Sequence, residues 1–147
     1  MTDFNGKTVT LRHIQIFICK NISETEMRKK RNVVIEITRG FDNDEKQLSL
    51  SERRGLDKSL NELVESAREQ SWPRKLYRSH RVVFPATVAQ KDSTLYMFKA
   101  TRFHIVILTF DEDPIFNQRI IQLLRIVSIR DSVEVFNAVA NLLYRNI

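Results

Sequence analysis

The chain has 147 residues, 42% of them hydrophobic, and contains only three glycines and three prolines. This length and composition predict a single folded domain over residues 1–147 and exclude a disordered chain. Lys and Arg number 24 against 18 for Asp and Glu, and the net charge of +6 favours a polyanionic partner such as nucleic acid. The one cysteine, Cys19, excludes a disulfide framework, and its apolar surroundings indicate a small buried side chain.

The sequence predicts neither a secretory signal nor a membrane-spanning segment. Residues 1–7 lack the basic and apolar regions of a secretory signal. The most apolar window, residues 103–110, is too short to cross a bilayer. We therefore expect a soluble intracellular protein with no membrane partner, in the cytoplasm or the nucleus.

Alternating apolar residues predict two strands in the N-terminal part of the chain. In residues 9–18 the alternation changes phase near His13, which indicates a bulge or a break. The second run, residues 33–37, alternates cleanly and ends near Gly40. The polar and acidic residues 41–47 that follow predict a loop.

An amphipathic helix is predicted after this loop. Ser49 and Glu52 have the spacing of a capping box, in which each side chain accepts from the other residue's backbone amide. Pro73 restricts Trp72 to extended conformations and so ends the helix before it. The apolar positions fall at steps of three and four and share one helix face: Leu56, Leu60, Leu63, Val64 and Ala67.

Strand patterns resume in residues 76–84, 95–98 and 102–110, and the last is so continuously apolar that it predicts a central strand. The apolar spacing of residues 115–127 predicts a helix. We interpret the acidic residues 111–113 as the negative N-terminus of that helix rather than as a cation site.

A last helix is predicted where Asp131 and Glu134 have capping-box spacing. The order of elements predicts an α+β fold: an antiparallel sheet, an amphipathic helix between two groups of strands, and C-terminal helices.

Residues with catalytic potential do not gather in any recognisable pattern. His13, His80 and His104 lie far apart, and no two histidines have the spacing of metal ligands. The three glycines are isolated, so no phosphate-binding loop is predicted. We expect His13 and His104 to be strand residues with local hydrogen bonds. The sequence therefore predicts a protein that is not an enzyme and uses no metal or cofactor.

Two groups of basic residues are candidates for RNA binding, because Arg and Lys neutralise phosphates. Tyr77 and Phe84 accompany the second group and are candidates for a wedge against a duplex end, with core packing as the alternative reading. Basic side chains on both faces of residues 76–84 predict an edge or rim strand. The first group has a solvated loop as its alternative. The groups are Arg28, Lys29, Lys30 and Arg31 on a connector, and Arg74, Lys75, Arg78, His80 and Arg81 around residues 76–84.

The order of these segments resembles the N-terminal domain of the Argonaute/Piwi family. Residues 76–84, Leu-Tyr-Arg-Ser-His-Arg-Val-Val-Phe, are similar to the family's Ala-Tyr-Asp-Gly-Lys-Lys-x-Leu-Tyr segment, with Arg78-Ser79 in place of Asp-Gly. Further segments resemble the family's opening strand, second strand, helix, later strand and last helix: residues 6–17, 33–37, 53–64, 103–107 and 133–145. The second strand lacks the family's paired tyrosines.

The resemblance implies a non-catalytic role. The domain would lie beside the far end of the guide/target duplex, limit its extension and help to separate the strands of a small-RNA duplex. Its partners would be a small-RNA duplex or guide/target RNA, and other Argonaute domains if a longer protein exists. A protein–protein interaction module with an incidental basic surface is the alternative, and a small hydrolase with an unrecognised site is another.

Overall fold

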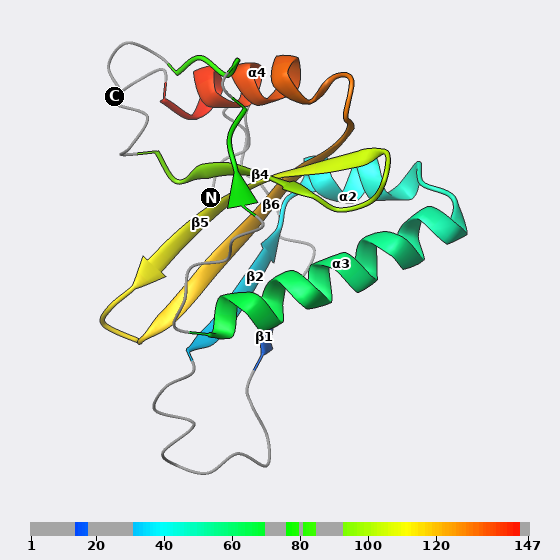
Figure 1. Ribbon diagram of the computed structural model, residues 1–147. Coiled ribbons are helices and arrows are strands. Elements are labelled where there is room, and N and C mark those ends of the chain that lie inside the picture. The colour runs from blue at the N-terminus through cyan, green and yellow to red at the C-terminus, as the bar shows by residue number, and fades with distance from the viewer. Residues whose placement is uncertain (1–13, 18–30, 70–75, 80, 85–92, 145–147) are drawn as a thin grey trace.

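The computed structural model describes residues 14–17, 31–69, 76–79, 81–84 and 93–144. In this part of the chain, six strands form one mixed sheet with three helices packed around it, an α+β fold (Figure 1). The elements are β1 (Ile14–Phe17), β2 (Asn32–Ile37), α2 (Arg39–Lys46), α3 (Leu50–Arg68), β3 (Leu76–Tyr77), β4 (Leu95–Lys99), β5 (His104–Asp113), β6 (Gln118–Ser128) and α4 (Ser132–Tyr144). The predicted fold class is confirmed.

The strand order across the sheet is β1-β2-β6-β5-β4-β3. Every neighbouring pair is antiparallel except β2 and β6, which run parallel from the Asn32–Gln118 pair to the Ile37–Leu123 pair. The predicted antiparallel sheet is therefore mixed at one position. The long connection between these two strands carries α2, α3 and the strands β3, β4 and β5.

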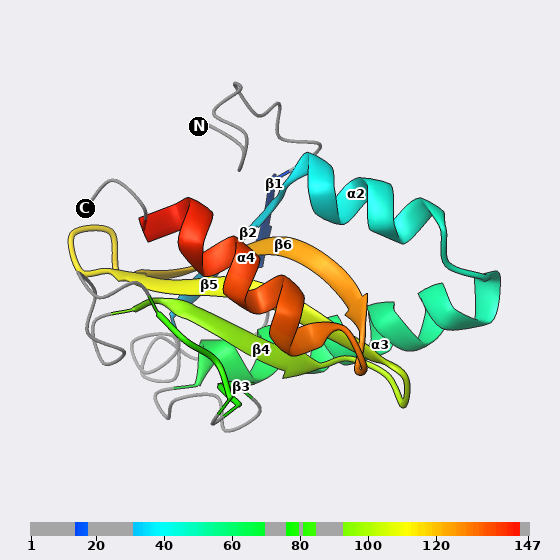
Figure 2. The same cartoon turned by 90° about the horizontal axis from the view of Figure 1, so that it is seen from above.

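The sheet is covered on both faces. Figure 2 shows the sheet from above, with α4 in front of it and α3 behind it. One apolar cluster joins the α3 face to Val106, Leu108 and Phe110, and a second joins the α4 face to Ile105 and Ile107. Alternate residues of β5 thus enter opposite cores, which explains its continuous apolar run. The central position predicted for this strand is confirmed.

The helix predicted over residues 115–127 is wrong, because most of this segment is strand β6. The register between β5 and β6 shifts between Ile107 and Leu108, which pair with Arg125 and Leu123 and leave Leu124 as an extra residue. A strand buried on both faces and interrupted by a bulge places apolar residues at steps of three. These steps imitate a helical period.

The acidic residues 111–113 are therefore not a helix N-terminus. They end β5 and lead into the turn to β6. Within the described residues, only one of the predicted C-terminal helices is present. It is α4, which begins at Ser132, one residue after Asp131.

The loop predicted over residues 41–47 is also wrong. Residues 39–46 form α2, whose N-cap Thr38 accepts from the Phe41 amide at 3.3 Å. Phe41 is the one fully buried side chain of this helix. A polar helix with one buried residue gives almost no apolar period, so pattern reading misses it.

The helix predicted after Ser49 is confirmed as α3. Both bonds of the capping box are present: the Glu52 amide donates to Ser49 Oγ, and the Ser49 amide donates to Glu52 Oε1, each at 3.2 Å. The helix ends at Arg68, before Pro73 as predicted. None of the helices in the described part of the chain is long and apolar enough to cross a membrane.

Candidate nucleic-acid interface

Of the described residues 76–79 and 81–84, only the first two form a strand, which lies at the edge of the sheet. Leu76 and Tyr77 pair with Phe98 and Met97 of β4. The strand predicted over residues 76–84 is thus shorter than expected, although β3 is an edge strand as predicted. Beyond it the chain passes to α4, where the Val83 amide donates to Asn137 Oδ1 at 2.8 Å.

Arg78 holds this segment against the sheet. Its Nε donates to the Leu95 carbonyl at 2.9 Å, and its terminal nitrogen donates to the Ser93 carbonyl. The guanidinium carbon lies 4.0 Å from the centre of the Tyr96 ring and 5.7 Å from that of Phe84. Because these contacts use Nε, one terminal nitrogen and the face of the planar group, Arg78 braces the edge of the sheet.

The two aromatic wedge candidates differ in their surroundings. Phe84 packs edge-on against Phe136 of α4 with ring centres 5.7 Å apart, and its ring centre lies 6.2 Å from that of Tyr144. Tyr77 is 39% exposed, and partial burial raises the pKa of its hydroxyl. Core packing therefore describes Phe84, whereas Tyr77 offers its ring to solvent at the edge.

Of the other residues in the second basic group, Arg81 is described and exposed. From the first group, Arg31 is described; it lies 2.9 Å from Glu112 Oε2, and its amide donates to the Arg68 carbonyl. Arg31 thus belongs to the junction of β2, α3 and β5. The remaining candidates lie outside the described residues, as do His13 and Cys19: Arg28, Lys29, Lys30, Arg74, Lys75 and His80.

Beside Arg31, the buried Arg119 secures the end of α3. It donates to the carbonyls of Ala67, at 2.7 Å, and Glu69, and its Nε lies 3.2 Å from Glu112 Oε1. Burial, followed by the charge of Arg31, lowers the pKa of this guanidinium. Arginine remains protonated in proteins, so the junction keeps its charge. Sequence reasoning did not identify Arg119, because its segment was read as helix.

Sequence reasoning also missed a second aromatic and basic surface, between β4 and β5 and after β6. Phe103 is 66% exposed, and the guanidinium carbon of Arg102 lies 5.6 Å from its ring centre. Phe103, Ser128, Ile129, Arg130 and Asp131 line an open hollow of about 420 Å³. The strand predicted over residues 102–110 includes Phe103 as its second residue, but β5 begins one residue after Phe103, at His104.

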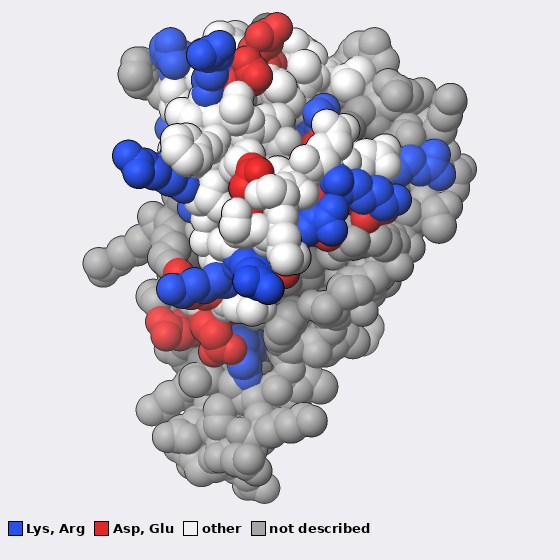
Figure 3. Space-filling model, turned by 90° about the vertical axis from the view of Figure 1, so that its right-hand side faces the viewer, with Lys and Arg blue, Asp and Glu red and all other residues white. Residues whose placement is uncertain are grey.

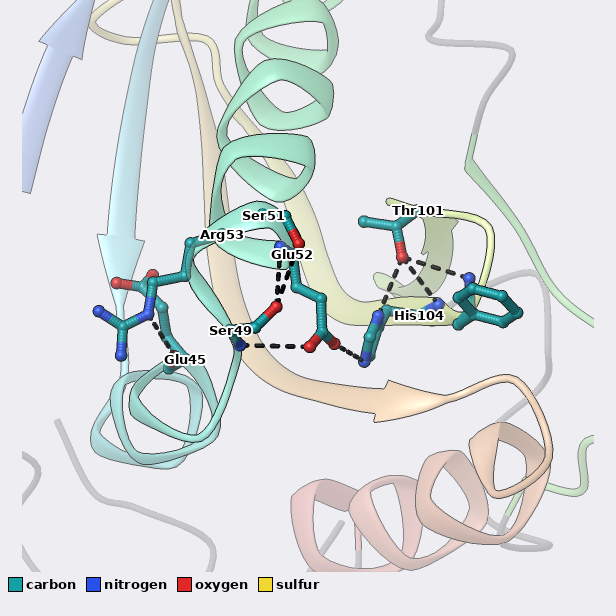
Figure 4. Close-up of polar contacts among 8 residues, drawn as sticks. Glu45, Ser49, Ser51, Glu52, Arg53, Thr101 and His104 are labelled. Atoms are coloured by element: carbon teal, nitrogen blue, oxygen red, sulfur yellow. Dashed lines mark hydrogen bonds and ion pairs between the residues drawn. The ribbon is translucent and has the colours of Figure 1, made fainter.

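His104 connects this surface to the start of α3, as Figure 4 shows. Its Nδ1 lies 2.9 Å from Thr101 Oγ1, and its Nε2 lies 3.2 Å from Glu52 Oε2. Hydrogen bonding with the side chain and backbone of Ser49, followed by the charge of His104, lowers the pKa of Glu52. The local hydrogen bonding predicted for His104 is confirmed. No group of three potential metal ligands occurs among the residues that the structure describes.

On one face of the molecule, the described basic side chains are spread out rather than gathered. Figure 3 shows Lys and Arg in several separate groups on one face, with carboxylates between them. The described residues of this face therefore form no continuous basic patch. Comparison with protein families, curated proteins and solved structures found no match.

Proposed function

We propose that this chain is the N-terminal domain of an Argonaute-like small-RNA silencing protein. It acts without catalysis, by positioning a guide/target duplex and assisting strand separation. The observation that carries the proposal is the order of elements along the chain. The segments that resemble the family occupy β2, α3, the edge segment 76–84, the start of β5, and α4, in that order. A resemblance of this kind suggests a role by analogy, and the surface must supply the contacts.

The edge of the sheet offers the contacts that this role needs. Tyr77 presents a partly exposed ring and Arg81 an exposed guanidinium, four residues apart. A ring can stack on a terminal base, while cations hold the phosphates without reading the sequence. Arg78 and Phe84 support this edge from behind through Tyr96 and Phe136. A partner duplex would then meet a rigid rim, and further Argonaute domains would hold the rest of the duplex, in the cytoplasm or the nucleus.

Fluorescence anisotropy with a short, labelled, blunt-ended RNA duplex tests this proposal. We expect weak binding with little sequence preference and a steep loss of affinity with added salt, because phosphate contacts dominate. Arg81→Glu should weaken binding more than Lys58→Glu, a matched charge reversal on the exposed side of α3. Absence of binding at low salt, or equal effects of the two reversals, would contradict the proposal.

One observation favours the second candidate, a protein–protein interaction module. Ile115 is 85% exposed and Phe116 is 71% exposed, and they are adjacent at the turn between β5 and β6. Two large apolar side chains so exposed side by side are typical of an interaction site. This role can accompany RNA binding, because the turn belongs to the β5–β6 hairpin, and β4 separates β5 from the edge strand β3 that carries Tyr77.

A further inference from the structure

The hairpin of β5 and β6 carries exposed apolar groups at both of its ends. At the turn, Ile115 and Phe116 form what we call the knob. At the opposite end, Phe103 is 66% exposed and Ile129 is 43% exposed. These two line the hollow described above. Figure 1 places the turn and the far end of the hairpin at opposite sides of the molecule.

The backbone of the knob is held by its own turn. Asp113 Oδ1 accepts from the Ile115 amide at 3.0 Å and from the Phe116 amide at 3.3 Å. Asn117 has a φ of 51°, in the left-handed region that asparagine tolerates better than most residues. Behind the turn, Arg119 binds the carbonyl groups at the end of α3. A fixed apolar knob loses little conformational entropy when it binds.

The hollow is fixed as well. The Ile129 amide donates to the Phe103 carbonyl at 3.0 Å, which closes the far end of the hairpin. The Ser128 hydroxyl donates to Asp131 Oδ2 at 3.0 Å and holds the turn that leads to α4. The open hollow of about 420 Å³ has room for an apolar side chain.

The charges at the two ends are of opposite sign. The knob follows Asp111, Glu112 and Asp113, whose charges are only partly offset by Arg31 and Arg119 on Glu112. The hollow lies between the exposed Arg102 and Arg130, and its one carboxylate, Asp131, accepts the Ser128 hydroxyl. In a chain with a net charge of +6, an acidic rim around the knob is a local exception. It fits a basic partner better than it fits RNA or an anionic membrane.

We propose that the knob of one molecule docks into the hollow of a second copy of this chain. The two sites of one molecule cannot meet, because the ten residues of β5 separate them by about 30 Å. The contact is therefore head-to-tail, and repetition of it gives a ring or an open chain of molecules. A contact built from one knob is small, so association is weak and depends on protein concentration.

Sedimentation velocity over a range of protein concentrations tests the proposal. We expect the wild-type chain to form dimers and larger species as concentration rises. Phe116→Asp replaces the aromatic side chain of the knob by a carboxylate, and Ile129→Asp places a carboxylate in the hollow. Each change should weaken self-association roughly tenfold or more, because an apolar anchor of the contact is lost. Val83→Asp is the matched control: Val83 is 67% exposed on another surface, and its replacement should leave association unchanged. Circular dichroism verifies that each variant is folded.

A mixture of the two interface variants gives the sharpest result. A Phe116→Asp molecule keeps its hollow and an Ile129→Asp molecule keeps its knob, so together they retain one intact contact. The mixture should form dimers and stop there, whereas each variant alone stays monomeric. A wild-type chain that is monomeric at every concentration overturns the proposal. So does association that survives Phe116→Asp, or a mixture that stays monomeric. If the wild-type chain does not self-associate and Phe116→Asp loses RNA binding, the knob contacts RNA instead, and the proposal is also overturned.

Discussion

Replacing each of the two aromatic residues of the edge segment by alanine separates structural support from contact with RNA. Phe84 is partly buried between Phe136, Tyr144 and the guanidinium of Arg78. Complete removal of a buried Phe side chain costs about 3 to 5 kcal/mol, and partial exposure of Phe84 reduces this to about 2 to 3 kcal/mol. For a chain of this length that loss lowers the melting temperature by about 4 to 12 °C.

Tyr77 should behave differently. It lies on a two-residue edge strand opposite Met97 and is 39% exposed. Its replacement by alanine should cost about 1 kcal/mol, the span of strand preferences measured in host proteins. The melting temperature would then fall by about 2 to 4 °C. If its ring stacks on the end of a duplex, Tyr77→Ala should lower the yield of separated strands while leaving initial duplex binding nearly intact, because the phosphate contacts remain.

Thermal melts followed by circular dichroism, beside duplex-binding and strand-separation assays, measure both effects on the same preparations. The matched change Val83→Ala, at an exposed residue of the same segment, reports what truncation alone does there. A Tyr77→Ala melt that drops further than that of Phe84→Ala would refute this reasoning. So would normal strand separation by folded Tyr77→Ala.

Three further changes test contacts within the fold. Arg78→Lys should cost about 1 to 2 kcal/mol in urea unfolding, because an ammonium cannot reproduce the planar contacts with the carbonyl groups and the Tyr96 ring. Asp44→Ala should lower the free energy of unfolding by about 2 to 3 kcal/mol, because Asp44 Oδ2 accepts from Arg125 Nε at 2.7 Å and from the Ile126 amide at 2.9 Å. Asp44→Asn should cost less in the same assay, because its side chain can still accept from that amide. Because the pKa of Glu52 is lowered, its carboxylate contributes stability above the ordinary value of 4.5, and this contribution is lost as the pH falls through the lower folded value. Glu52→Gln should therefore make the free energy of unfolding fall less steeply toward acid pH.

The sequence carries enough local information to predict α3 and β5. The capping box needs only Ser49 and Glu52, and the burial of β5 on both faces is visible as a continuous apolar run. Elements stabilised by contacts distant in the chain were missed. Residues 39–46 are helical in part because Asp44 reaches Arg125 and Ile126 in β6, 81 and 82 positions away. A contact of that kind leaves no periodic signal in either segment.

The candidate interface could likewise be predicted only in part from the sequence. That residues 76–84 form an edge could be predicted, because basic side chains on both faces of a strand exclude full burial. Which of those side chains remain available could not be predicted, since Arg78 turns toward the Ser93 and Leu95 carbonyls and Phe84 toward α4. Both depend on where β4 and α4 lie in space. Phe103 escaped notice for a related reason, because an aromatic residue one position before a strand reads as part of it.

In the proposed role, neighbouring residues of one short segment either support the edge of the sheet or remain exposed for contact with the duplex. Arg78 and Phe84 bind inward to β4 and α4, whereas Tyr77 and Arg81 remain exposed beside them. On a mobile loop, an exposed ring would move when the end of a duplex contacted it. Stacking on that ring would then do little to stop extension of the duplex. Because the segment is fixed from within by a cation between two rings and by edge-on aromatic packing, the ring of Tyr77 keeps its position. The proposed strand separation would therefore depend on Arg78 and Phe84 for rigidity, although the proposal assigns neither of them a contact with RNA.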